Sequence, residues 1–189
     1  SQFYMRDQSS TKSVDASKPD TDPDAVSNAN NINLNQLLTT ADVTISGGND
    51  RNQILMRAAG SYSNNFRSGS RDIKSLNALY FDVSDKRFNM SARIGRQTKN
   101  GYGILGRFDG AFVGWQFSPA VRFNVAAGFP VLTSRQMHVL TDRFFYGVSA
   151  DIGSKNDRLQ TSVYWFDQRS HGLIDRQSVG TELRYLDPK

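Results

Sequence analysis

The residues of this chain that could do chemistry are charged side chains spread over extended segments, not a compact catalytic motif. The chain has two histidines, His138 and His171, and a histidine can serve as a general base. No set of serine, histidine and acid is recognisable as catalytic from the spacing of these residues. The motifs GxxxxGK[ST], HExxH and D-x-D-x-D-G are also absent. With no cysteine, thiolate chemistry and cysteine metal sites are excluded. We therefore expect no enzyme activity, no cofactor and no metal.

The charged residues instead recur on one side of alternating segments. Arg107 and Asp109 are two residues apart, so they share a face of an extended strand and could pair with each other or with neighbouring strands. The whole set consists of Arg57, Asp82, Arg93, Arg107, Asp109, Arg122, Asp151, Glu182 and Arg184. Mixed charges of this kind suit a face in contact with water. An ordinary exposed sheet face and a structural ion pair are the alternatives.

The elements that must position these residues are strands, because the hydrophobic period is two from residue 34 onward. In VRFNVAAGFPV (121–131), for example, Phe123 and Val125 face one way while Arg122 and Asn124 face the other. The pattern predicts about nine strands. They lie at 34–46, 52–64, 75–84, 87–97, 103–117, 121–132, 143–153, 159–168 and 176–186. The pattern changes parity near Gly110, where we expect a bulge.

Residues 1–33 differ from the rest and are expected to form a polar acidic loop or tail. They carry three cations and five anions, and "QFYMR" is expected to be the end of an earlier strand. The excess of positive charge, +7, therefore belongs to residues 34–189. Because the arginines are dispersed and do not form a basic stripe with stacking aromatics, we expect no nucleic-acid partner.

Strand and connector lengths favour a membrane barrel over a soluble sheet. Many expected strands exceed the roughly 5–6 residues of soluble sheets and match the roughly 9–11 of tilted bilayer-spanning strands. Connectors are expected to alternate between short (GGND, DK, SPA, SKND) and long (NNFRSGSRDIK, QTKNGYG, LTSRQMHVLTD, QRSHGLID). Aromatic residues near strand ends would form interfacial girdles. These are Tyr62, Phe66, Phe88, Phe117, Phe129, Phe144 and Tyr185.

Residues 34–189 resemble porin-like outer-membrane β-barrels of Gram-negative bacteria, with "ARIGRQ" (92–97) and "GRFDG" (106–110) similar to strand segments of such porins. The resemblance implies apolar side chains on lipid and the charged set on a water-filled lumen as pore-lining residues. These barrels usually end in a strand with a terminal aromatic, whereas this chain stops at "RYLDPK". We therefore expect an excerpt of a larger barrel.

The resulting prediction is an all-β, antiparallel up-and-down transmembrane β-barrel over residues 34–189, located in the outer membrane. It would pass small anionic solutes or an exported polymer, and it would contact lipid and, at its long loops, partner proteins. Two alternatives remain open from the sequence. One is a structural or surface-binding barrel without transport, and the other is a soluble secreted β-sandwich that acts as a binding module.

Overall fold

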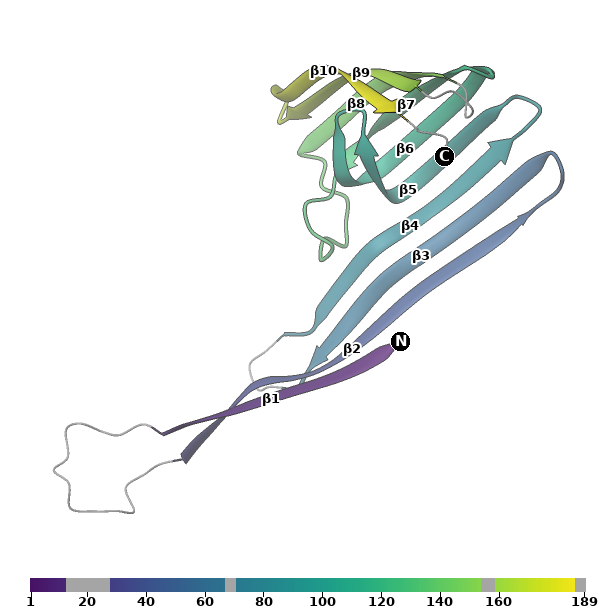
Figure 1. Ribbon diagram of the computed structural model, residues 1–189. Helices are drawn as coiled ribbons and strands as arrows, with labels where there is room; N and C mark the ends of the chain where they lie inside the picture. Colours follow the sequence, from purple (N-terminus) through teal and green to yellow (C-terminus); the bar gives the residue numbers. More distant parts are fainter. Residues whose placement is uncertain (13–27, 67–70, 154–158, 186–189) are drawn as a thin grey trace, which may run out of the picture. The chain divides into compact units, whose positions relative to one another are not determined.

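The computed structural model describes residues 1–12, 28–66, 71–153 and 159–185, and these residues form one antiparallel sheet without a helix. Each strand pairs with its neighbour in sequence, as Figure 1 shows. The strands are β1 (Gln2–Lys12), β2 (Asn28–Gly48), β3 (Asn52–Asn65), β4 (Ile73–Asp85), β5 (Met90–Gly101), β6 (Ile104–Ser118), β7 (Val121–Pro130), β8 (Arg143–Ile152), β9 (Leu159–Ser170) and β10 (Leu173–Tyr185). The predicted all-β antiparallel meander is confirmed.

The sheet is not closed into a barrel. β1 and β10 stand at the two ends of the strand order, and no ladder joins them within the described part of the chain. Internal contacts divide the chain into two units, residues 1–40 with 61–74 and residues 41–60 with 75–189.

The first unit contains β1, paired with the first part of β2 from Gln2 opposite Thr39 to Lys12 opposite Asn28. The expectation that "QFYMR" belongs to a strand is confirmed, but residues 7–12 and 28–33 are also strand, although we expected a loop or tail there. A backbone ladder of an antiparallel hairpin does not need apolar side chains, which explains why this polar segment misled the prediction. The remainder of the expected loop, residues 13–27, lies outside the described residues.

The second unit contains the better-patterned strands, and their register departs from one expectation. The β5–β6 ladder is unbroken from Met90 opposite Trp115 to Gly101 opposite Ile104, so the bulge expected near Gly110 is wrong. Glycine is needed there for a different reason, because a Cβ on Gly110 would lie 2.2 Å from the Ala127 carbonyl oxygen of β7. The register of β6 against β7 shifts later, between Gln116 and Ser118.

The connectors follow the expected alternation only in part. Residues 49–51, 86–89 and 119–120 are short links, and 131–142 is a long one, as expected. The connectors after β5 and β9 were expected to be long, but each contains two residues, Tyr102–Gly103 and His171–Gly172. All four have positive φ (56° and 78°, 50° and 83°), the backbone of a two-residue turn matched to strand twist. The strands therefore continue as hairpins through the segments expected to be loops.

The core of the second unit is a row of aromatic rings on one face of the sheet. Phe145 of β8 lies between Phe108 of β6 and Phe166 of β9, with ring centroids 5.0 and 5.4 Å away. β7 lies between β6 and β8 and contributes the small residues Ala126 and Gly128 there, which leaves room for the rings. These aromatic side chains are almost fully buried.

Replacing the central ring should destabilise the fold strongly. We expect Phe145→Ala to lower the free energy of unfolding by roughly 3–5 kcal/mol, because it leaves a cavity between two rings. The matched control is Phe88→Ala, whose ring is exposed in the β4–β5 turn and should cost less than about 1 kcal/mol. Denaturant titration of the purified chain measures both. Equal midpoint shifts for the two variants would contradict this packing.

Candidate functional site

The two faces of the second unit differ in which side chains they expose. We call the face that carries Asn124 and Ser149 the inner face, and the opposite one the outer face. On the outer face Val125 is 52% and Val148 is 49% exposed, although they stand opposite each other in the β7–β8 ladder. On the inner face Asn124 is 4% and Ser149 is 7% exposed. These apolar side chains of the outer face are thus open, whereas the inner face buries polar side chains as well as the aromatic core.

On the outer face, two groups of aromatic side chains are separated along the strands by aliphatic side chains. Near the β6–β7 turn, Trp115, Phe117 and Phe123 form a cluster with centroid distances of 5.4–6.2 Å. Aliphatic residues follow, and a second aromatic row comes after them. That row runs from Phe129 through Phe144 and Tyr146 to Trp165, with centroid distances of 5.3, 6.1 and 5.5 Å. Charged residues lie beside this second row, since Asp109 stands opposite Phe129 and Asp167 stands opposite Tyr146. The charged residues there are Arg96, Asp109, Asp167 and Arg169.

Arg107 and Asp109 lie on the outer face, which corrects the prediction that they share the wet face with the other charged residues. Asp109 stands opposite Arg96, a residue the sequence did not single out, and accepts two hydrogen bonds from its guanidinium at 2.7 and 2.6 Å. Arg96 is only 4% exposed and also donates to the Gln136 carbonyl oxygen of the 131–142 connector. The Nε of Arg107 is buried without a hydrogen-bond partner among the described residues.

On the inner face, Asp151 is the centre of a hydrogen-bond network. Its carboxylate accepts hydrogen bonds from the Tyr102 hydroxyl (3.1 Å), the Asn124 amide (2.9 Å) and the Ser162 hydroxyl (2.7 Å). These donors come from the β5–β6 turn, β7 and β9, so the network ties together segments that are distant in sequence. Beside it is a cavity of about 720 Å³, whose lining also includes Glu182.

The β5–β6 turn reaches across the inner face to β10. The backbone N–H of Tyr102 donates to Glu182 at 3.0 Å, and Arg176 donates to the Gly103 carbonyl oxygen at 2.7 Å. A Cβ on Gly103 would lie 2.8 Å from the Cβ of Phe166, so only glycine fits there. Tyr102 has a left-handed backbone conformation that is rare for an aromatic residue. Strain of this kind persists only where surrounding contacts hold it.

A smaller cavity of about 220 Å³ lies on the same face. Its lining includes Asp82, which binds the Arg93 guanidinium at 2.6 Å, and Lys99. Arg122 lines both cavities and donates to Ser91 Oγ at 2.8 Å and to Asn124 Oδ1 at 3.1 Å. The structure thus brings the polar residues of β4, β5 and β7 to one place.

Of the predicted set, Asp82, Arg93, Arg122, Asp151, Glu182 and Arg184 line these two cavities. Arg57 does not line them, and its half-exposed side chain binds Asp42 of β2 at 3.0 and 2.6 Å. Lys99 and Tyr102 line the cavities but escaped the prediction, because they lie in "QTKNGYG", which we expected to be a loop. Extending the alternation of β5 through Lys99 would have found the lysine.

The two histidines stay apart from these cavities. His138 is exposed in the 131–142 connector, and His171 is exposed in the β9–β10 turn, where its Nδ1 lies 3.3 Å from the hydroxyl of the adjacent Ser170. In the described part of the chain, no three His, Asp or Glu side chains gather in a way that could hold a metal ion.

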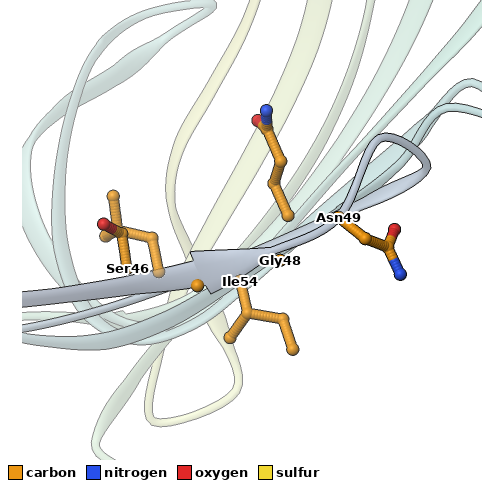
Figure 2. A pocket seen from close by; sticks show the side chains of 7 residues that line it. Ser46, Gly48, Asn49 and Ile54 are labelled. Carbon is orange, nitrogen blue, oxygen red and sulfur yellow. The ribbon is translucent and has the colours of Figure 1, made fainter.

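A further pocket, of about 430 Å³, lies at the β2–β3 turn. Figure 2 shows that the side chains of Ser46, Asn49 and Ile54 do not converge on a common point. Asn49 Oδ1 is already engaged, since it accepts hydrogen bonds from the backbone N–H groups of Arg51 and Asn52 at 2.9 and 2.8 Å. This pocket is a feature of the turn and contains no ionisable side chain in its lining.

No protein-family model matches this chain, and no curated protein or solved structure matches it. The described residues contain no helix with the length and hydropathy that a membrane span needs. The site is therefore interpreted from its own geometry.

The half-buried position of Tyr102 predicts a pH effect. Burial raises the pKa of Tyr102 to about 12, and the charge of Asp151 and its hydrogen bond to the hydroxyl act in the same direction. The hydroxyl therefore stabilises the fold fully below pH about 10, where an unfolded tyrosine begins to ionise, and this contribution is lost as the pH rises towards 12. We expect the stability advantage of the natural chain over Tyr102→Phe to shrink between pH 9 and 12 in denaturant titrations. A constant difference across that range would contradict this assignment.

Proposed function

We propose that this chain forms part of the wall of an outer-membrane β-barrel whose wet interior passes small anionic solutes or an exported polymer. The observation that carries the proposal is the inversion of polarity between the two faces. Val125 and Val148 are open to the surroundings while Asn124 and Ser149 are buried. In water this arrangement would expose an apolar surface at a cost of roughly 25 cal/mol per Å². Against lipid that cost disappears.

The order of side chains on the outer face supports the same proposal. Barrels of the outer membrane carry an apolar band between two aromatic girdles. Here the Trp115 cluster and the Phe129–Trp165 row enclose the aliphatic residues of β7 and β8, and Phe117 and Phe144 are two of the aromatics predicted for girdles. The Arg96–Asp109 pair lies level with the second row, since Asp109 stands opposite Phe129. A girdle is the place where a strand passes from lipid to polar surroundings.

The composition of the inner face supports passage of polar solutes. The two cavities of about 720 and 220 Å³ are lined by charged and amide side chains. Together their linings contain four cations, Arg93, Lys99, Arg122 and Arg184, against the three acids Asp82, Asp151 and Glu182. A small surplus of positive charge favours anions over cations in a confined aqueous space.

The open sheet edges impose a condition on this proposal. Unpaired backbone groups of β1 and β10 cannot remain in lipid, because no water is available to bind them. The ten strands therefore require further strands that close the wall. A soluble β-sandwich is less well supported, since it needs two sheets packed face to face, whereas the described strands belong to one sheet.

A barrel without transport is the second candidate, and one observation favours it. The rings of Phe108, Phe145 and Phe166 fill the inner face at the end where the charged outer residues lie, and the β5–β6 turn crosses to β10. If these elements fill the cross-section of the closed barrel, the protein would serve as a structural or surface-binding barrel.

Conductance in planar lipid bilayers separates the two candidates. We expect the purified chain to form channels whose zero-current potential in a salt gradient reports an anion preference, because cations prevail along the cavities. Arg122→Gln should reduce that preference, since Arg122 lines both cavities. Arg169→Gln is the matched control, because Arg169 pairs with Asp167 on the outer face. A preference for cations would overturn the anionic assignment, and absence of channels would favour the barrel without transport.

A further inference from the structure

The smaller inner-face cavity contains more positive charge than its acids can balance. Three cations, Arg93, Lys99 and Arg122, line it together with a single carboxylate, that of Asp82. This carboxylate is already bound to Arg93 at 2.6 Å. Lys99 and Arg122 are therefore left as two cations without an acid of their own in this lining.

Lys99 is held in place by aromatic rings. Its Nζ lies 4.4 Å from the ring centroid of Phe112 and 5.0 Å from that of Tyr102, and it forms no ion pair with any described residue at salt-bridge distance. Cation–π contacts fix an ammonium group but leave its positive charge unneutralised. Lys99 therefore presents a fixed positive charge to the cavity.

Arg122 is fixed in a similar way by neutral groups. Its guanidinium donates to Ser91 Oγ and Asn124 Oδ1, at 2.8 and 3.1 Å, and neither acceptor carries charge. The charges of Asp151 and Glu182 also act on Lys99, and Asp151 stands opposite Arg122 in the β7–β8 ladder. No carboxylate of the described residues lies within salt-bridge distance of Arg122, so its charge is not paired there. The charge of Arg122 acts on Lys99 as well, so the two cations repel each other until an anion comes between them.

We infer that this cavity is a binding site for a small tetrahedral oxyanion, such as inorganic phosphate or sulfate. Lys99 and Arg122 supply the charge-assisted hydrogen bonds, and the hydroxyl of Ser91 lies in the same lining. The volume of about 220 Å³ holds roughly seven waters at about 30 Å³ each, which leaves room for the ion and part of its hydration shell. The site would give the proposed passage its anion preference, and in that respect it rests on the proposed function.

Binding of inorganic phosphate to the purified full chain in detergent tests the site. We expect saturable binding of one phosphate per chain in calorimetric titration, with at least tenfold weaker binding in Lys99→Met and in Arg122→Gln. Lys99→Arg keeps the charge and should bind within a few-fold of the natural chain. Arg57→Gln is the matched control, because Arg57 pairs with Asp42 and does not line the cavity.

Two outcomes would overturn the inference. One is the absence of saturable phosphate binding by the natural chain, and the other is equal binding by Lys99→Met, Arg122→Gln and Arg57→Gln. If one variant fails to fold, the other cavity variant still decides. Phosphate binding in detergent is measured independently of conductance. The two experiments therefore distinguish a protein that binds phosphate but forms no channel from one that forms a channel but binds no phosphate.

Discussion

The account of this structure depends on what lies against the exposed apolar side chains of the outer face. Apolar outer-face residues of the central strands, among them Phe123, Val125 and Val148, are exposed, and the proposal places these side chains against lipid. The inner face buries polar groups beside its aromatic core, because carboxylate, amide and hydroxyl groups there bind one another across strands. A soluble sheet places the same two kinds of side chain the other way round. The rows of aromatic and charged residues on the outer face follow from this inversion.

The inner face holds charged groups in one region and packed aromatic rings in another. Asp151 must be kept in a partly buried position, and three neutral donors from separate segments satisfy its oxygens. Aromatic rings fill the space further along the face, where β7 has only small residues opposite them. The β5–β6 turn connects the two regions, because Tyr102 binds the acidic network while Gly103 packs against Phe166. The fold thus holds Asp151, Lys99 and Arg122 with neutral partners, and these two cations form no ion pair with a described residue.

The sequence predicted the strands well because a period of two needs only local information. Expected strands such as 52–64 and 143–153 differ from β3 and β8 by a residue at one end. Contacts between distant segments were beyond this reasoning. Arg107 and Asp109 were placed on the wrong face because we judged the face by charge, whereas the β5–β6 register sets it. Tyr102 was missed because a turn was expected to be a solvated loop. Whether the charged set lines a pore stays a prediction.

The most direct test of the central claim uses the absence of cysteine in the natural sequence. Single cysteines at Val125→Cys, Val148→Cys and Ser162→Cys can each carry a spin label, with the chain reconstituted in lipid vesicles. Oxygen partitions into hydrocarbon and a nickel chelate stays in water, so their relaxation effects report the surroundings of each label. The account predicts that labels at positions 125 and 148 respond to oxygen and that the label at position 162 responds to nickel. Equal nickel access at all three positions would contradict it.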